Sequence, residues 1–485
     1  MLFNSLSFLI FFLITVAVYF LIPKRAKNFS LLVASYVFYM GWNPKYALLL
    51  LFCTAVTFGA SLLIERIRVG GGSHKSVKAV LAGAISLILA TLFYYKYLHF
   101  ALELLAAILS GLHIKLGLPT VDILLPVGIS FFSFQAIGYL VDVYRGQIHA
   151  ERNFFKYALF VSFFPQLVAG PIERSRNLLS QLDGTHRFDF ENLKSGLFTI
   201  VWGYFLKVVV ADRAAILVNF VYGNESATGI QIAFATFFFA FQIYCDFAGY
   251  STIACGAARI LGINLMQNFA SPYFSSSFSE FWRRWHISLS TWFRDYLYIP
   301  LGGNKKGRIR KNVNTLIVML VSGIWHGAGL NFFLWGLLHG IFQVADDATR
   351  SLRAHSTSRV RKIVQTLFTF ACVCFTWLFF RAQSVSHAIT LLKKIIFRLE
   401  PLTLFRHNAD KYHLETEDLK LLMLSIALIL LVDFARYNNI SIKKWIFSRH
   451  WIVQSASIIA MTLFILVFGI WGSGYNASSF IYFQF

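Results

Sequence analysis

The chain has 485 residues, of which 57% are hydrophobic and 14% are charged, and 44 Lys and Arg against 22 Asp and Glu give it a net charge of +22. A soluble globular domain carries about 25% charged residues, so this composition and a mean hydropathy of +0.62 exclude that class and indicate a protein surrounded by the lipid bilayer. The basic residues cluster in short loops between apolar runs, which is the positive-inside pattern of membrane proteins, so no nucleic-acid partner is expected.

Apolar runs follow one another along the whole chain without a long polar linker. The first run, 2–22, has no basic residue before it and no small-residue cleavage site after it, which predicts a retained helix and not a signal peptide. The runs 31–42 and 46–64 turn at Asn43-Pro44, and the run 79–98 follows. The later runs are 124–143, 154–169, 196–221, 230–260, 313–345, 363–380, 419–434 and 451–471.

These runs predict an all-α polytopic membrane protein with a single domain over 1–485. A full span needs about 20 residues, so we expect roughly ten to twelve spanning or partly spanning helices, some of them re-entrant or interfacial. The basic clusters lie at 24–27, 66–78, 305–311, 350–362 and 443–444. Because such clusters stay in the cytoplasm, they predict that both the N-terminus and the C-terminus face the outside.

Two polar islands interrupt the apolar runs before residue 260. The segment 164–174 joins two prolines and a glycine at a helix end, which predicts a re-entrant or interfacial turn packed inside protein. Asp246 places a carboxylate inside the apolar run 230–260. We interpret it as a hydrogen bonder in helix packing or as a partner for a histidine or an arginine.

A denser polar island runs from 280 to 303. Glu280, Arg283 and Arg284 are spaced three and four residues apart, share one side of a helix, and are expected to form an ion-paired lining. An interfacial amphipathic helix whose arginines reach the lipid headgroups is the alternative. The following loop, 302–311, either holds the phosphates of a cytoplasmic donor or only sets the topology. Its five cations are Lys305, Lys306, Arg308, Arg310 and Lys311.

The run 313–345 carries two histidines, His326 and His339. An ionisable side chain at membrane depth is costly and is therefore a functional candidate. Both flanks of the run are basic, so we expect a hairpin or broken pair that turns near 327–331, where glycines let a ligand or backbone approach closely. Burial favours the neutral imidazole that a general base needs, which makes His326 the candidate base. A structural histidine, hydrogen-bonded to a neighbouring helix, is the alternative.

No cofactor or metal is expected to be bound. The five cysteines all lie in apolar runs without ligand spacing, which predicts apolar packing. The sequence contains no Walker loop, dinucleotide-binding fingerprint, serine elbow or zinc spacing, and no internal repeat of the transporter kind.

Seven runs, in collinear order, resemble the membrane-bound O-acyltransferases. Their sequences are most similar to the bacterial alginate O-acetylation branch. They are 126–146, 164–174, 244–251, 280–303, 322–340, 376–383 and 480–485. The resemblance places the family's invariant histidine on His326 and its upstream polar partner on His286, both lining a central tunnel across the membrane. It places the second family histidine on His339, and it assigns Asp246 to a run with a structural role.

The resemblance implies an acetyltransferase of the bacterial inner membrane with acetyl-CoA as its cytoplasmic donor substrate. His326 would act as general base towards an acceptor hydroxyl. His286 would either take an orienting role in this step or stabilise the charge that develops during it. The acetyl group would serve the O-acetylation of an exported polysaccharide such as alginate. A periplasmic, hydrolase-like acetyltransferase is the expected partner, because no sizeable soluble domain exists here to hold a polysaccharide. Two alternatives stay open: D-alanyl transfer to teichoic acid, and a transporter or flippase in which the histidines relay protons.

Overall fold

The computed structural model describes residues 1–114, 124–184, 186–349, 358–403, 414–471 and 481, and these residues form helices and turns without a strand. Five helices are long and apolar enough to cross a membrane, and two apolar helices are shorter. The five are Lys45–Val69, His74–Gly111, Gly229–Ile260, Arg359–Arg381 and Trp451–Phe468, and the two are Leu6–Leu21 and Ile129–Tyr144. The predicted all-α polytopic class is therefore confirmed, while the number of spanning or partly spanning helices stays a prediction.

Contacts divide the chain into two compact units. The first is Met1–Gly196 with Ala254–Met266, and the second is Leu197–Ile253 with Gln267–Phe485. The single domain over 1–485 stays a prediction. Most of the basic cluster at 350–362 and of the terminal run at 480–485 lies outside the described residues.

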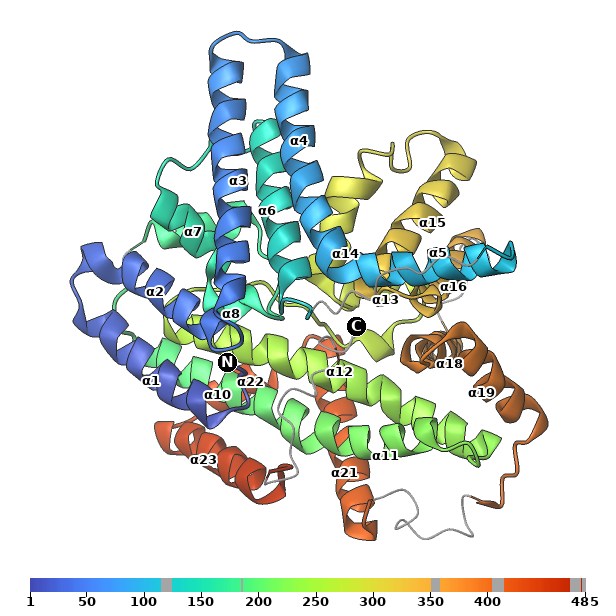
Figure 1. Ribbon diagram of the computed structural model, residues 1–485. Coiled ribbons are helices and arrows are strands. Elements are labelled where there is room, and N and C mark those ends of the chain that lie inside the picture. Colours follow the sequence, from blue (N-terminus) through green and yellow to red (C-terminus); the bar gives the residue numbers. More distant parts are fainter. Residues whose placement is uncertain (115–123, 185, 350–357, 404–413, 472–480, 482–485) are drawn as a thin grey trace. The chain divides into compact units, whose positions relative to one another are not determined.

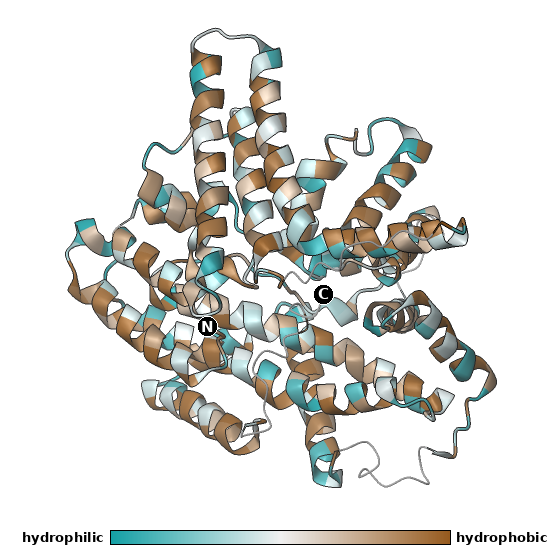
Figure 2. Cartoon of the chain, viewed as in Figure 1, coloured by the Kyte–Doolittle hydropathy of each residue, from teal (hydrophilic) through white to brown (hydrophobic). Residues whose placement is uncertain are grey.

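The first unit is built around three long helices, α3, α4 and α6, which lie side by side (Figure 1). A π-helical turn, η2 (Phe93–Tyr97), joins α4 to α5, so the predicted run 79–98 belongs to a longer helix that bends at this turn (Figure 1). Figure 2 shows α3 and α4 as mainly hydrophobic, as expected for helices that face lipid. The helices of this unit are α1 (Leu6–Leu21), α2 (Lys27–Met40), α3 (Lys45–Val69), α4 (His74–Leu92), α5 (Leu98–Gly111), α6 (Ile129–Tyr144), α7 (Phe154–Ser162), α8 (Phe164–Leu167) and α9 (Ser175–Leu182).

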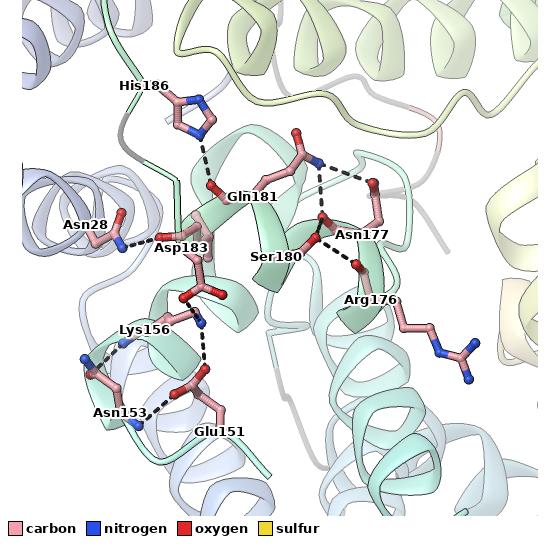
Figure 3. Close-up of polar contacts among 11 residues, drawn as sticks. Asn28, Glu151, Asn153, Lys156, Arg176, Asn177, Ser180, Gln181, Asp183 and His186 are labelled. Carbon is pink, nitrogen blue, oxygen red and sulfur yellow. Dashed lines mark hydrogen bonds and ion pairs between the residues drawn. The ribbon is translucent and has the colours of Figure 1, made fainter. Parts of the chain in front are cut away.

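Polar contacts hold the α7 and α9 region of the first unit together. Lys156 Nζ lies 2.8 Å from Glu151 Oε2 and also pairs with Asp183, directly after α9 (Figure 3). The carbonyl of Gln181 lies 2.9 Å from His186 Nε2. Between α7 and α9, residues 164–173 are buried, as expected for a turn packed inside protein.

The second unit carries the histidines and the polar island that the sequence singles out. Its elements are α10 (Phe190–Tyr204, which begins in the first unit), η3 (Phe205–Ala211), α11 (Asp212–Gly223), α12 (Gly229–Ile260, which ends in the first unit), η4 (Pro272–Phe274), α13 (Phe278–Arg284), α14 (Ile287–Phe293), η5 (Arg294–Tyr298), α15 (Gly307–His326), α16 (Leu330–Ala348), α18 (Arg359–Arg381), α19 (Val385–Phe397), α21 (Thr416–Tyr437), α22 (Ile442–Phe447) and α23 (Trp451–Phe468). The hairpin expected over 313–345 is confirmed, because α15 ends at His326 and α16 begins at Leu330.

One predicted boundary is wrong. The loop expected over 302–311 ends earlier, since α15 begins at Gly307. Arg308, Arg310 and Lys311 therefore lie in the first turns of a helix, because arginine and lysine are themselves good helix formers. Only Lys305 and Lys306 remain in the turn before it.

Candidate active site

The α15–α16 hairpin places His326 at its turn, and two glycines let the helices approach closely. A Cβ on Gly323 would lie 2.3 Å from the carbonyl oxygen of Phe332, and one on Gly336 would lie 2.4 Å from that of Met319. Side chains at either position would force the helices apart. The glycines therefore fix the geometry of the turn that carries His326.

His326 is enclosed by aromatic rings and is only 3% exposed. The ring centroids of Trp325 and Trp335 both lie 5.0 Å from that of the imidazole, and the ring of Phe380 on α18 lies at 5.6 Å. All three contacts are edge-on, the preferred arrangement for such pairs. The predicted break between two apolar helices at His326 is confirmed, while its depth in the membrane stays a prediction.

The structure brings His286 to His326, as the resemblance implied. Their ring centroids are 6.2 Å apart, although 40 positions separate the two residues in sequence. His286 is fully buried, and the ring of Phe247 on α12 packs edge-on against it at 4.6 Å. Its backbone is left-handed, with φ 42° and ψ 55°, at the junction between α13 and α14. Strained backbone of this kind in a bulky residue is concentrated at functional sites.

His339 is held on both sides by hydrogen bonds. The indole Nε1 of Trp282 donates to its Nδ1 at 3.3 Å, and Thr376 Oγ1 lies 2.9 Å from its Nε2. The Thr376 hydroxyl donates its one hydrogen to the carbonyl of Val373, so it accepts from Nε2–H of His339. These contacts assign the neutral Nε2–H tautomer to His339 and indicate that it orients Trp282.

The expected ion pair on α13 is present. Arg284 Nε lies 3.0 Å from Glu280 Oε1, and Ser276 donates to the other carboxylate oxygen at 2.9 Å. Burial by itself would raise the pKa of Glu280, but the hydrogen bonds from Ser276 and the Arg284 charge outweigh it and lower this pKa below its usual value. Arg283 is on the exposed side of the same helix.

A pocket of about 590 Å³ lies between α13, α14 and η5 on one side and α15 and α16 on the other. Arg283, Arg294 and Lys311 line it, and Lys311 Nζ pairs with Asp347 Oδ1 at 2.6 Å. Neither His286 nor His326 lines this pocket, but two lining residues, Ser322 and Ser290, lie close to them along the helices. Ser322 precedes His326 by four residues, and the amide of Ser290 donates to the carbonyl of His286 at 2.9 Å. Each is thus one helical turn, or roughly 6 Å along the axis, from a histidine.

Of the five cations assigned to the donor loop, Lys311 lines this pocket. Lys305, Lys306, Arg308 and Arg310 are exposed and do not line it. Arg294 was missed as a lining residue, although its place in the polar island 280–303 was a usable signal. The cations at the pocket therefore come mainly from α13 and η5.

Asp246 pairs with a lysine, which the sequence analysis did not name beside its two alternatives, a hydrogen bonder in helix packing and a partner for a histidine or an arginine. Lys207 Nζ lies 2.7 Å from Asp246 Oδ1 and 2.8 Å from Asp212 Oδ1, and all three side chains are at least 90% buried. The amide of Ile481 also donates to Asp246 Oδ2 at 2.8 Å. A single lysine within the run 196–221 was the signal that sequence reasoning missed.

Among the described residues, no group of three His, Cys, Asp or Glu side chains is arranged to hold a metal ion. The five cysteines are free, and two of them, Cys53 and Cys245, are buried.

Comparisons with known proteins place the same residues inside one family. The family model described as MBOAT, membrane-bound O-acyltransferase family, matches residues 146–386, which include His286, His326 and His339. The probable alginate O-acetylase AlgI of Pseudomonas putida is 36% identical over 439 residues, 90% of this chain and 88% of that protein. The peptidoglycan O-acetyltransferase of Helicobacter pylori is 36% identical over 435 residues, covering 82% and 80%. The teichoic acid D-alanyltransferase of Bacillus subtilis is 26% identical over 277 residues, covering 54% and 70%.

Proposed function

Since the chain belongs to the membrane-bound O-acyltransferase family and is a multi-pass membrane O-acetyltransferase, we propose that it moves acetyl groups from cytoplasmic acetyl-CoA across the bacterial inner membrane for O-acetylation of an exported polysaccharide such as alginate. Relatives named for alginate and for peptidoglycan acetylation are equally identical to it. Alginate is favoured because five of the relatives, at 35–37% identity, are named for alginate O-acetylation.

One observation carries the chemistry: two buried histidines 6.2 Å apart, each one helical turn from a pocket lined by cations. The arginines suit the phosphates of acetyl-CoA, because one guanidinium group can donate two parallel hydrogen bonds to phosphate oxygens. A thioester held near Ser290 and Ser322 would lie about one helical turn from the two buried histidines.

In the proposed step His326 takes the proton of an acceptor hydroxyl, whose oxygen attacks the thioester carbonyl carbon. The carbon–sulfur bond breaks, the thiolate leaves and receives the proton from His326, and the acetyl ester of the acceptor remains. His286 orients His326 or stabilises the negative charge that develops on the carbonyl oxygen. The acceptor is either the polymer or a periplasmic, hydrolase-like acetyltransferase that passes the acetyl group on.

The test is reconstitution of the purified protein in liposomes with acetyl-CoA on the cytoplasmic side. Release of CoA with acetylation of an acceptor on the other side is the expected result. D-alanyl transfer from a carrier protein in place of acetyl transfer would favour the function named for the Bacillus subtilis relative. Solute uptake without acyl chemistry would favour a proton-coupled transporter or flippase.

The proposed orientation has its own test. Reporter fusions after Arg68, Arg308 and Arg359 should be cytoplasmic, and a fusion after Phe485 should be periplasmic, since basic loops are retained inside. If the fusions at Arg308 and Arg359 lie on opposite sides, the donor cannot enter as proposed.

A further inference from the structure

The backbone around His286 is held in its left-handed conformation from outside its own helix. His286 stands at the start of α14, with φ 42°. The first amides of a helix have no partner within that helix and need acceptors from elsewhere. A bulky residue in this backbone region persists only where its surroundings impose it.

The acceptors come from Asn268. Its carbonyl oxygen accepts from the amide of Ile287 at 2.9 Å, and its side-chain Oδ1 accepts from the amide of Ser288 at 3.3 Å. Asn268 thus does for α14 what a capping side chain normally does within the same segment. Two further hydrogen bonds of 3.0 Å join the same two segments. The amide of Ala270 donates to the carbonyl of Arg284, and the Arg284 side chain donates to the carbonyl of Ala270.

Helix α12 supports this arrangement at two points on one face. The Nδ2 of Asn268 donates to Ser251 Oγ at 3.0 Å, and both residues are at most 3% exposed. Phe247, four residues before Ser251, packs against the His286 ring. One face of α12 therefore contacts the ring directly and the backbone through Asn268.

We propose that Asn268 is a positioning residue that, anchored by Ser251, sets the backbone of His286 so that its imidazole faces His326. This inference rests on the proposed role of His286. Asn268 acts through His286 and is not itself placed at the pocket.

The test is a double-mutant cycle on purified protein, with turnover of acetyl-CoA as the measured reaction. Asn268→Ala should lower kcat about 10–100-fold, because a small displacement of a catalytic group has effects of this size. The KM for acetyl-CoA should change less than about threefold, since no pocket contact is removed. In the His286→Ala background the same substitution should cost less than about threefold, because the residue that it positions is gone.

Two more variants keep the test decisive. Ser251→Ala retains both capping acceptors and removes only the anchor, so it should give a smaller loss of kcat in a well-folded protein. Gln454→Ala is the matched control, because Gln454 is also a buried amide that holds a helix junction, by donating to the carbonyls of Phe447 and Arg449. It should lower stability without changing kcat.

Equal losses of kcat in the wild-type and His286→Ala backgrounds would overturn the inference, as would a rise in KM that accounts for the loss. Failure of the proposed function has a different signature: wild-type protein that does not turn over acetyl-CoA, or a His326→Ala variant that retains its activity.

Discussion

Two regions of the second unit each bury a polar side chain, and they differ in what surrounds it. Around Lys207, one ammonium meets two carboxylates at 2.7 and 2.8 Å, so charge is balanced by charge inside the protein. Around His326, the polar group meets aromatic rings and lies one helical turn from a pocket. The first arrangement suits a fixed structural role, because breaking such a pair is costly. The second places a titratable group one helical turn from a pocket, which suits a group that exchanges protons with a bound ligand.

The largest effect is expected from His326→Ala, which should remove activity without lowering the amount of protein. Loss of a general base costs about 10²–10⁴ in rate, while removing a ring from an aromatic cage leaves the hairpin glycines and α16 contacts in place. Acetylation of the exported polymer should therefore be abolished at normal protein level, as measured by ester content and immunoblot of the membrane fraction. Near-normal acetylation by a well-expressed variant would remove His326 from the mechanism.

Asp246→Ala should show the reverse pattern. It leaves the buried Lys207 with only one of these two carboxylates, and removal of one partner of a buried pair costs about 3–5 kcal/mol. The variant should lose protein level and thermal stability in detergent, while the molecules that fold keep a kcat near that of the wild type. Glu417→Ala is the control, because its pair with Lys420 is exposed and should contribute less than about 1 kcal/mol. A stable Asp246→Ala protein without activity would make the ionic cluster part of the active site.

The contrast also explains what could be read from the sequence. His326 was predictable because glycines and a polar residue break an apolar run, and the ion pair of Glu280 with Arg284 followed from helical spacing. The partners of buried groups were not predictable in this way. Lys207 and Asp246 lie 39 positions apart, and Trp282 and Thr376 reach His339 from 57 and 37 positions away. Only the packing of distant helices determines such pairs.

His339 is another buried imidazole of the second unit, and both of its nitrogens are hydrogen-bonded to other side chains. His339→Leu should leave Trp282 Nε1–H without its acceptor and lower stability by about 1–3 kcal/mol, with a kcat loss of about tenfold through the displaced indole. His339→Gln keeps one acceptor and one donor, so it should recover most of the activity. His326→Gln should recover none, because an amide does not accept a proton at neutral pH. Equal behaviour of the two glutamine variants in kcat assays would mean that both histidines act as bases, or that neither does.

The smallest effect is expected from the cations. Arg283 and Arg294 line the pocket, whereas Lys305, Lys306, Arg308 and Arg310 are exposed outside it. If the pocket takes the donor, Arg283→Gln with Arg294→Gln should raise the KM for acetyl-CoA several-fold with little change in kcat, because a remote phosphate contact is equally strong in the ground and transition states.

Neutralising Lys305 and Lys306 together is the matched comparison, since it removes the same charge from side chains that do not line the pocket. We expect an unchanged KM and a lower amount of inserted protein, because these lysines then act through topology. Raised salt should weaken the arginine contacts in the wild type, as exposed charges are screened over about 8 Å at physiological ionic strength. A KM effect from the lysine pair at normal expression, with none from the arginine pair, would move the phosphate site back to the turn before α15. The pocket would then no longer be the proposed site for the donor phosphates, although it would still lie close to the histidines.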